Sequence, residues 1–432
     1  MQVVLEIDQS NGRTLQQQVF QQIRSHILEG RLRGGDPVPA SRELSQQLGV
    51  SRNTVIIAYD RLLSEGYLES RASVGTFVST ALPENAMNTS SKPIALLPTD
   101  TTKNADIRVE DPKVAHSVIS PGRGQAQVDY WVGRSDPESF PAREWRRILD
   151  TKIRYSTTRL SQYADPQGVL AFRQAISDHL GPARGVSASP DEIVCTNGSQ
   201  GGLELIARAF STRFKTLVHE DPCYSGAISV FGNGGYDLIG VPVDDEGLVV
   251  DSLPRVRNAL IYVTPSHQYP TGVTLSLKRR IELLEWAEAT GSVILEDDYN
   301  GDFRYEGAPL TALHGLDRRG SVIYIGTFSK SLGPSLRLGY LACEKQLAQT
   351  LGRWQGVVSN GLPWLEQAAM ADFVANGGFR RHLRRIRAIY MARRNVLADA
   401  LQPVFPEAEL LGLRGGMHIA VRGPGLDAKR AQ

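Results

Sequence analysis

The sequence predicts an α/β fold for most of the chain, preceded by a smaller helical unit. From residue 128 onward, segments with helical periodicity alternate with short runs of β-branched and aromatic residues. This alternation is typical of a mostly parallel sheet covered by helices. The strand-like runs are IVCTNG, TLVHED, ALIYVTP, SVILEDD and SVIYIGT. A length of 432 residues also exceeds that of one ordinary domain, so two or three are expected.

The composition describes a globular protein with a sizeable core. Hydrophobic residues make up 41% of the chain and charged residues 22%, which is ordinary for folded domains. The sequence contains no apolar run of about 18 residues, as a membrane-spanning helix needs, and no secretory leader is visible. Cys195, Cys223 and Cys343 are widely spaced, so we expect reduced thiols and a cytoplasmic protein.

Three amphipathic helices are predicted within the first 66 residues. Ser41 is expected to cap the second helix, which Gly49 ends, and Ser51 is expected to cap the third. A helix, a tight glycine turn and a second helix form the helix-turn-helix pattern. Two short extended runs, residues 67–68 and 76–78, then predict a β-wing.

The arginines of this unit are placed as in a DNA-binding motif. Residues 1–80 hold eight arginines and eight acidic residues, 8 − 8 = 0, so DNA binding has to rest on position rather than on net charge. The first turn of a recognition helix reaches base edges. A solvated helix face is the alternative. The residues predicted to contact DNA are Arg42, Ser51, Arg52, Asn53, Thr54, Arg71 and Gly75.

A linker is predicted between the two units. Residues 81–127 are rich in Ser, Thr, Pro and Lys and show no sustained periodicity. The segment is longer than the loops within compact domains. We therefore expect one unit at residues 12–80 and another at 128–432.

One lysine follows a predicted buried strand and lies among groups that suit a phosphate. The run VIYI predicts the strand, and the chain then breaks at Gly326. A lysine held partly desolvated has a lowered pKa and can act as a Schiff-base nucleophile. Hydroxyls and an arginine suit a phosphate monoester, whereas for the lysine alone an exposed loop position is the alternative. The residues concerned are Thr327, Ser329, Lys330 and Arg337.

Three adjacent carboxylates, Glu296, Asp297 and Asp298, end another predicted strand. Like charges so close together repel one another unless a positive group lies among them. A pyridinium nitrogen is one candidate, because a neighbouring carboxylate keeps such a ring protonated. A divalent metal is a second, weakened by the lack of a nearby histidine, and a solvated loop is a third. Together with Lys330, the carboxylates favour a pyridoxal phosphate site without a metal.

Several motifs together resemble a known family. Residues 15–78, with VPASRELSQQLGVSRNTV, resemble a GntR-type winged helix-turn-helix. Residues 128–417, with TPSHQYPTG, EDDY and GTFSK, resemble a fold-type I aminotransferase domain. In this order the two resemble the MocR subgroup of GntR regulators. The resemblance implies a regulator that binds operator DNA, holds pyridoxal phosphate as a Schiff base and senses this cofactor or an amino compound. An active aminotransferase with an appended DNA-binding domain is the alternative.

The resemblance also implies individual roles. Lys330 would form the Schiff base, Asp297 would pair with the pyridinium nitrogen, and Tyr299 would approach the phenolic oxygen. Tyr224 would stack on the ring, and Tyr163 of a neighbouring subunit would reach the phosphate, which implies a homodimer. Gly198, Ser199 and Gln200 open a predicted helix whose N–H groups can face an anion. The further cofactor-binding residues are Gly198, Ser199, Gln200, His267, Gln268, Thr327, Ser329 and Arg337.

The chain departs from common aminotransferases at two places. The residues before PTG are His267, Gln268 and Tyr269 instead of an asparagine, which favours the regulator. No residue before Gln432 matches the C-terminal arginine that clamps a substrate carboxylate. The large subdomain is therefore expected to reach about residue 345, with an incomplete small subdomain after it and negligible transaminase activity. The basic stretch 379–394 is expected to be a solvated helix face, with contact to the DNA backbone as the alternative.

Overall fold

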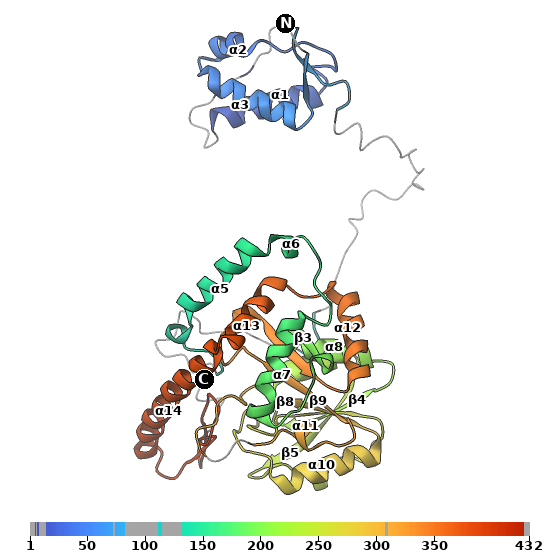
Figure 1. The fold of residues 1–432 in the computed structure, drawn as a ribbon, viewed down its shortest axis with the longest axis vertical. Helices are drawn as coiled ribbons and strands as arrows, with labels where there is room; N and C mark the ends of the chain where they lie inside the picture. The colour runs from blue at the N-terminus through green and yellow to red at the C-terminus, as the bar shows by residue number, and fades with distance from the viewer. Residues whose placement is uncertain are drawn as a thin grey trace. The chain divides into compact units, whose positions relative to one another are not determined.

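The computed structural model describes residues 5, 7, 14–71, 74–82, 111–114, 132–306 and 310–426. Contacts divide the chain into two units, residues 1–109 and 110–432, and Figure 1 shows the elements of each. The predicted linker, residues 81–127, lies almost entirely outside the described ranges.

The first unit has the predicted helix-turn-helix and wing. Its helices are followed by an antiparallel hairpin in which Leu68 pairs with Val78. One apolar cluster, with Val19, Leu44 and Leu62 fully buried, holds these elements together. The elements are α1 (Leu15–Leu28), α2 (Ser41–Leu48), α3 (Arg52–Ser64), β1 (Leu68–Arg71) and β2 (Gly75–Val78).

One of the two predicted serine caps is present. The Ser51 hydroxyl accepts a hydrogen bond from the Thr54 N–H at 3.1 Å and begins α3. The prediction for Ser41 is wrong, because Ala40 is the N-cap and Ser41 is already helical. The Ser41 hydroxyl instead accepts a long hydrogen bond, 3.4 Å, from Nε of Arg52. Gly49 ends α2 with φ of 65°, a left-handed conformation that costs glycine little.

The second unit is built on one eight-stranded sheet with the order β3-β10-β9-β8-β7-β4-β5-β6. The five predicted strands are all present, and β5, β4, β7, β8 and β9 are mutually parallel. The sequence analysis missed β5, β6 and β10, of which β10 runs antiparallel to both of its neighbours. The strands are β3 (Ile193–Asn197), β4 (Thr216–Asp221), β5 (Asp237–Asp244), β6 (Gly247–Leu248), β7 (Leu260–Val263), β8 (Val293–Asp297), β9 (Val322–Thr327) and β10 (Leu338–Ala342).

Helices cover both faces of this sheet, as an α/β fold requires (Figure 1). In β9, Ile323 and Ile325 face the cluster formed with α8, α9 and α12, whereas Tyr324 faces the one formed with α7, α13 and α14. The hairpin of β11 (Glu409–Leu411) and β12 (Ala420–Arg422) lies after the last helix. The helices are α5 (Ala142–Tyr155), α6 (Thr157–Leu160), α7 (Leu170–Arg184), α8 (Gly198–Phe210), α9 (Ser225–Asn233), α10 (Leu277–Thr290), α11 (Leu313–Leu316), α12 (Lys345–Ser359), α13 (Trp364–Ala375) and α14 (Gly378–Val404).

The predicted basic stretch forms the first part of α14, with Leu383 and Ile386 buried. The expectation of a solvated face is confirmed for Arg381, Arg385 and Arg393, which are exposed, and is wrong for Arg387 and Arg394, which are half-buried. All five side chains also have partners within the protein. They bind segments that are distant in the sequence, so local composition did not reveal their acceptors. The pairs are Arg381 with Glu144, Arg385 with the Ser139 carbonyl, Arg387 with the Asp302 carbonyl, Arg393 with Asp136, and Arg394 with Glu306.

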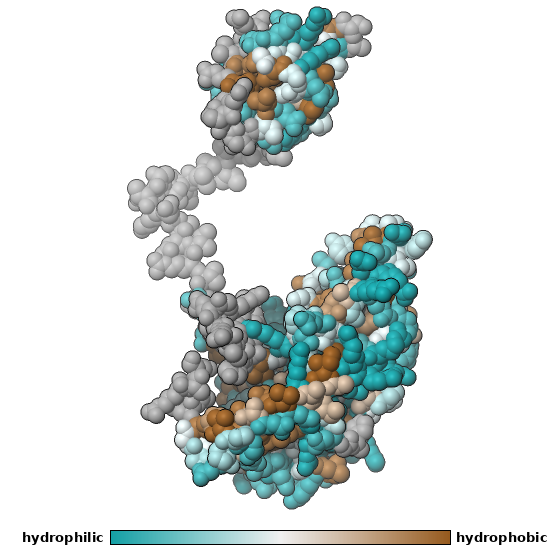
Figure 2. All heavy atoms as spheres, turned by 90° about the vertical axis from the view of Figure 1, so that its left-hand side faces the viewer, coloured by the Kyte–Doolittle hydropathy of each residue, from teal (hydrophilic) through white to brown (hydrophobic). Residues whose placement is uncertain are grey.

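The surface of the second unit is mixed, and Figure 2 shows hydrophobic patches among hydrophilic residues on the face it presents. Within the described ranges no helix is both long and apolar enough to cross a membrane. The carboxyl ends of the parallel strands β7, β8 and β9 meet at one edge of the sheet, which is where ligands bind in open α/β sheets. Asp297 and Thr327 end two of these strands, so the fold itself brings the predicted site residues together.

Candidate functional site

Lys330 lies in the turn that follows β9. Its Nζ donates a hydrogen bond to the Gly133 carbonyl at 3.0 Å. Burial lowers the pKa of this amine, while the nearby Asp297 acts in the opposite direction. The lysine is therefore held partly desolvated, as a nucleophilic amine requires.

The three carboxylates at the end of β8 have different surroundings. Glu296 accepts hydrogen bonds from the N–H groups of Leu313 and His314 at 2.8 and 2.9 Å, at the start of α11. Asp298 forms a buried ion pair with Arg184, the last residue of α7, and accepts a hydrogen bond from Tyr324 at 2.6 Å. Backbone N–H groups thus stabilise one of these two carboxylates and a cation the other, although Oδ1 of Asp298 has no hydrogen-bond partner among the described residues.

Asp297 is the carboxylate that remains. Its Oδ2 accepts a hydrogen bond from the Tyr262 hydroxyl at 2.8 Å, whereas its buried Oδ1 has no hydrogen-bond partner among the described residues. Burial raises the pKa of Asp297 to about 7, against the opposing effects of Tyr262 and Lys330. A buried acceptor without a donor costs free energy until a donor arrives. The N–H of a protonated ring nitrogen fits this requirement, so these residues are compatible with a pyridoxal group.

A second part of the site can receive an anion. Arg337 donates to the Asn197 carbonyl at 2.7 Å, directly before α8. A Cβ on Gly198, whose φ is +70°, would lie 2.8 Å from Nη2 of Arg337, so the guanidinium packs on the bare backbone of that glycine. Thr327 donates to the Ser329 hydroxyl at 2.9 Å. A helix N-terminus and an arginine together favour a phosphate group.

Contacts between aromatic rings connect the residues of these two parts. Tyr224 precedes α9 and donates to Oε1 of Gln200 at 3.3 Å, which ties it to the first turn of α8. The Tyr269 ring contacts those of Tyr224 and Tyr299 edge to face, with centroids 5.9 Å apart in both pairs. The buried hydroxyl of Tyr299 has no partner among the described residues. It is thus a donor available to an oxygen of a bound group.

Two residues of the HQYPTG segment have different roles: Gln268 holds the loop in place, and His267 lies beside the site. Gln268 is buried and its amide binds protein atoms, donating to the Pro222 carbonyl at 2.7 Å and accepting from the Thr271 hydroxyl at 2.6 Å. This side chain fixes the loop. His267 is buried as well, and burial lowers its pKa to about 3, so its imidazole is neutral.

His418 is a site residue that the sequence analysis did not identify. Its ring contacts those of His267 and Tyr269, with centroids 4.8 and 5.7 Å apart. Nε2 lies 3.0 Å from the Pro270 carbonyl, which can only accept, so Nδ1 is an unprotonated acceptor. Burial and the Lys330 amine both lower the pKa of His418. The feature of the sequence that could have indicated His418 is the pair Gly415 and Gly416 shortly before it. Gly416 packs directly on the site, because a Cβ there would lie 2.3 Å from the His267 ring.

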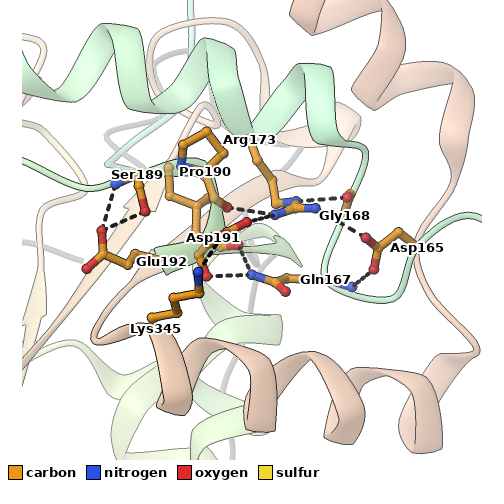
Figure 3. A network of polar contacts seen from close by, with 10 residues as sticks. Asp165, Gln167, Gly168, Arg173, Ser189, Pro190, Asp191, Glu192 and Lys345 are labelled. Atoms are coloured by element: carbon orange, nitrogen blue, oxygen red, sulfur yellow. Dashed lines mark hydrogen bonds and ion pairs between the residues drawn. The ribbon is translucent and has the colours of Figure 1, made fainter.

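Tyr163 lies apart from these residues. Its side chain is 87% exposed, and no described hydrogen bond or ring contact joins it to the lysine turn. The loop after Tyr163 is held by hydrogen bonds, which Figure 3 shows. The buried Arg173 donates to the Gly168 and Pro190 carbonyls at 3.0 and 2.7 Å and pairs with Asp165. Tyr163 is therefore an exposed side chain two residues before a segment held by several hydrogen bonds.

The residues predicted to contact DNA lie on the surface of the first unit. Arg42, Arg52 and Asn53 are exposed at the starts of α2 and α3. Ser51 and Thr54 are joined hydroxyl to hydroxyl at 2.8 Å. In the wing, Arg71 pairs with Glu69 at 2.6 Å, and Gly75 is exposed at the start of β2. Residues 72–73 of the predicted wing lie outside the described ranges.

Comparison with known proteins agrees with both units. Residues 15–78 match the family of bacterial regulatory proteins of the gntR type, and residues 135–432 match the class I and II aminotransferases. The probable rhizopine catabolism regulatory protein MocR of Rhizobium meliloti is 35% identical over 91% of this chain and 78% of its own length. The chain belongs to the MocR subgroup of GntR-type transcriptional regulators.

Two further similarities describe this MocR-type chain. The pyridoxine biosynthesis transcriptional regulator PdxR of Corynebacterium glutamicum is 34% identical over 94% of the chain and 82% of its own length. The crystal structure of kynurenine aminotransferase from Pyrococcus horikoshii covers 69% of the chain with 31% identity and a TM-score of 0.63, and the match includes 76% of that enzyme. The chain is therefore a DNA-binding regulator whose second unit has the fold of an aminotransferase.

The raised pKa of Asp297 predicts a pH-dependent stability in cofactor-free protein. The carboxyl titrates near 4 when unfolded and at about 7 when folded, so the native state binds more protons between these values. The free energy of unfolding therefore falls as pH rises through that window. Asp297→Asn should make the fall of the unfolding free energy with pH less steep, by up to about 1.4 kcal/mol per pH unit. Urea unfolding between pH 5 and 8 measures it.

Asp298→Asn is the matched control. It leaves the buried Arg184 without its partner and should cost about 3–5 kcal/mol at pH 8, where Asp297→Asn should instead be more stable than wild type. Equal slopes for Asp297→Asn and wild type would contradict the proton uptake assigned to this carboxyl.

Proposed function

We propose that this MocR-type regulator carries pyridoxal phosphate on Lys330 and that the state of this site controls binding to operator DNA. The observation that carries the proposal is the separation of the three carboxylates. Both oxygens of Glu296 bind backbone N–H groups, and Asp298 is paired with the Arg184 guanidinium. Asp297 has no ion pair among the described residues, keeps its buried Oδ1 without a hydrogen-bond partner, and lies close enough to Lys330 to affect the pKa of that amine.

Each part of the site has a role in this proposal. When bound, pyridoxal phosphate supplies an aldehyde for an amine to attack and a ring that withdraws electrons. Lys330 is the amine, and Asp297 keeps a proton on the ring nitrogen. Tyr299 donates to the phenolic oxygen and Tyr224 packs against the ring. The N-terminus of α8 and Arg337 hold the phosphate together with the Thr327 and Ser329 hydroxyls.

The effector is proposed to be the cofactor itself or an amino compound. Lys330 would hold the cofactor, and an amino compound would compete with this amine for the cofactor's aldehyde group, so both ligands would act at the Lys330 site. The neutral imidazoles of His267 and His418 lie beside this site and can accept hydrogen bonds from such a compound.

We further propose that the chain acts as a homodimer in the cytoplasm, where its operator DNA is located. Tyr163 is exposed on an ordered loop, as a residue that completes a partner's phosphate site would be. Apolar side chains are exposed near it, including Tyr155 and Leu160 at 82% and 51%. A two-fold dimer would also match a pseudo-palindromic operator.

An active aminotransferase is the second candidate. The observation that favours it is a complete set of lysine, aspartate and tyrosine in a partly desolvated site, on a fold shared with the Pyrococcus horikoshii enzyme, which was crystallised in complex with PMP.

Steady-state assays separate these two functions. For a regulator, we expect an amino acid to change operator binding without sustained release of keto acid. Sustained turnover at an ordinary enzymatic rate would favour the enzyme instead.

Lys330→Ala should abolish the absorbance of the covalently attached cofactor, because it removes the amine that forms the bond. Lys278→Ala on the surface of α10, with a side chain 83% exposed, should keep that absorbance. Absorption spectra of both variants after gel filtration, followed by borohydride reduction and peptide mapping, provide the measurement. A reduced adduct on a different lysine would contradict the assignment.

Arg52→Ala should weaken binding to the DNA upstream of the protein's own gene by about 1–3 kcal/mol if the side chain contacts a base. Preference at particular base pairs should relax as well. The control is Arg31→Ala, which removes the same charge from an exposed arginine paired with Glu29 in the turn after α1. Electrophoretic shifts at two salt concentrations measure both. A smaller salt slope with unchanged preference would make Arg52 a phosphate contact.

A further inference from the structure

The segment 132–136 lies on the lysine turn and gives the Lys330 amine its acceptor. Nζ donates to the Gly133 carbonyl at 3.0 Å. Gly133 has a φ of +87°, and a Cβ there would lie 2.5 Å from Nζ. Both the backbone conformation and the close approach therefore require glycine at this position.

The same segment is anchored on both sides of the site. The Ser135 hydroxyl lies 2.9 Å from the Ser329 carbonyl and 3.2 Å from the Lys330 carbonyl. The Asp136 N–H donates to the Tyr390 hydroxyl of α14 at 2.9 Å, and its carboxylate pairs with Arg393 at 3.1 Å. Residues 135–136 are thus fixed to the lysine turn and to α14, whereas Gly133 is held by the amine.

Attachment of an aldehyde changes what this amine can donate. The carbon–nitrogen bond forms with loss of one water molecule, which takes the aldehyde oxygen and two hydrogens from the nitrogen. At most one hydrogen then remains on Nζ, and it lies in the plane of the new double bond. Nζ would therefore lose the freely rotating N–H donors with which the amine holds the Gly133 carbonyl.

We propose that the Gly133 carbonyl positions the free Lys330 amine and is released when the amine reacts, so that residues 132–134 report the state of the site. This inference rests on the proposed attachment at Lys330. In the sequence these residues come shortly after the predicted linker, 81–127. The change at residues 132–134 therefore occurs in the part of the second unit that follows the predicted linker to the DNA-binding unit in the sequence.

Hydrogen–deuterium exchange of the full chain tests this inference. In wild type, adding pyridoxal phosphate should speed exchange at the amides of residues 132–134 by about fivefold, because a segment that is no longer held at the Gly133 carbonyl opens more often. Lys330→Ala should exchange at the faster rate already without the cofactor and should not respond to it. Gly133→Ala should do the same, because the added Cβ displaces the amine.

Gly235→Ala is the matched control. It places alanine at a similar φ of +80° with no atom within 4 Å of the new Cβ, and it should behave as wild type. If Gly235→Ala matched Gly133→Ala, backbone strain alone would explain the effect and the inference would fail. Unchanged or slower exchange in wild type that carries the cofactor, shown by its absorbance, would also overturn it.

Failure of the proposed function gives a different result. If wild type never develops the absorbance of attached cofactor, the assignment of Lys330 fails first. Cofactor-free wild type and Lys330→Ala can then still be compared. Equal exchange at residues 132–134 would show that the amine does not hold the segment, whereas faster exchange in the variant would support the positioning role of Gly133.

Discussion

The burial of three neighbouring carboxylates at the end of β8 is the constraint on which the site depends. Charges so close together in a poorly solvated place raise one another's pKa unless each has a partner. Backbone N–H groups stabilise Glu296, whose pKa nevertheless rises to about 7 through burial. Arg184 neutralises Asp298. Among the described residues, Asp297 is thus the one carboxylate of the three with neither an ion pair nor a backbone N–H donor, so it suits a cationic ring nitrogen.

This division requires elements from several parts of the unit. Arg184 comes from the end of α7, the N–H groups from the start of α11, and Tyr262 from β7. Arg387 of α14 binds the carbonyl of Asp302 just beyond the carboxylates, and His382 of the same helix lies 2.6 Å from the Ser331 carbonyl next to Lys330. The site is consequently a product of the whole sheet and its helices, and a local change in any of them reaches it.

The sequence was most informative where a function is carried by adjacent residues. The motifs around Asp297 and Lys330 and the helix-turn-helix could be predicted because their spacing follows from strand ends and helix starts. The strands β5 and β10 were missed, since a glycine interrupts the apolar run in both and a proline interrupts it again in β5. Ser41 was assigned as a cap by residue type, although the helix begins one residue earlier.

Groups brought together by the tertiary fold could not be predicted. His418 and Gly133 lie 88 and 197 residues from Lys330 in the sequence (418 − 330 and 330 − 133), and nothing in their local pattern indicates that amine. The partners of the arginines of α14 were not predicted for the same reason, because the carbonyls and carboxylates that bind them belong to segments distant in the sequence. Sequence periodicity identifies which side of a helix is buried, but it does not identify the partners of the other side.

The packing of Arg337 on Gly198 has a consequence for how such chains diverge. The two residues are 139 positions apart (337 − 198), yet a side chain at 198 would occupy the place of the guanidinium. Neither position can therefore change freely while the other is kept, so the two should covary among relatives. A lineage that ceased to anchor a phosphate would lose both constraints together, and the paired loss would mark it as a regulator that no longer depends on this cofactor.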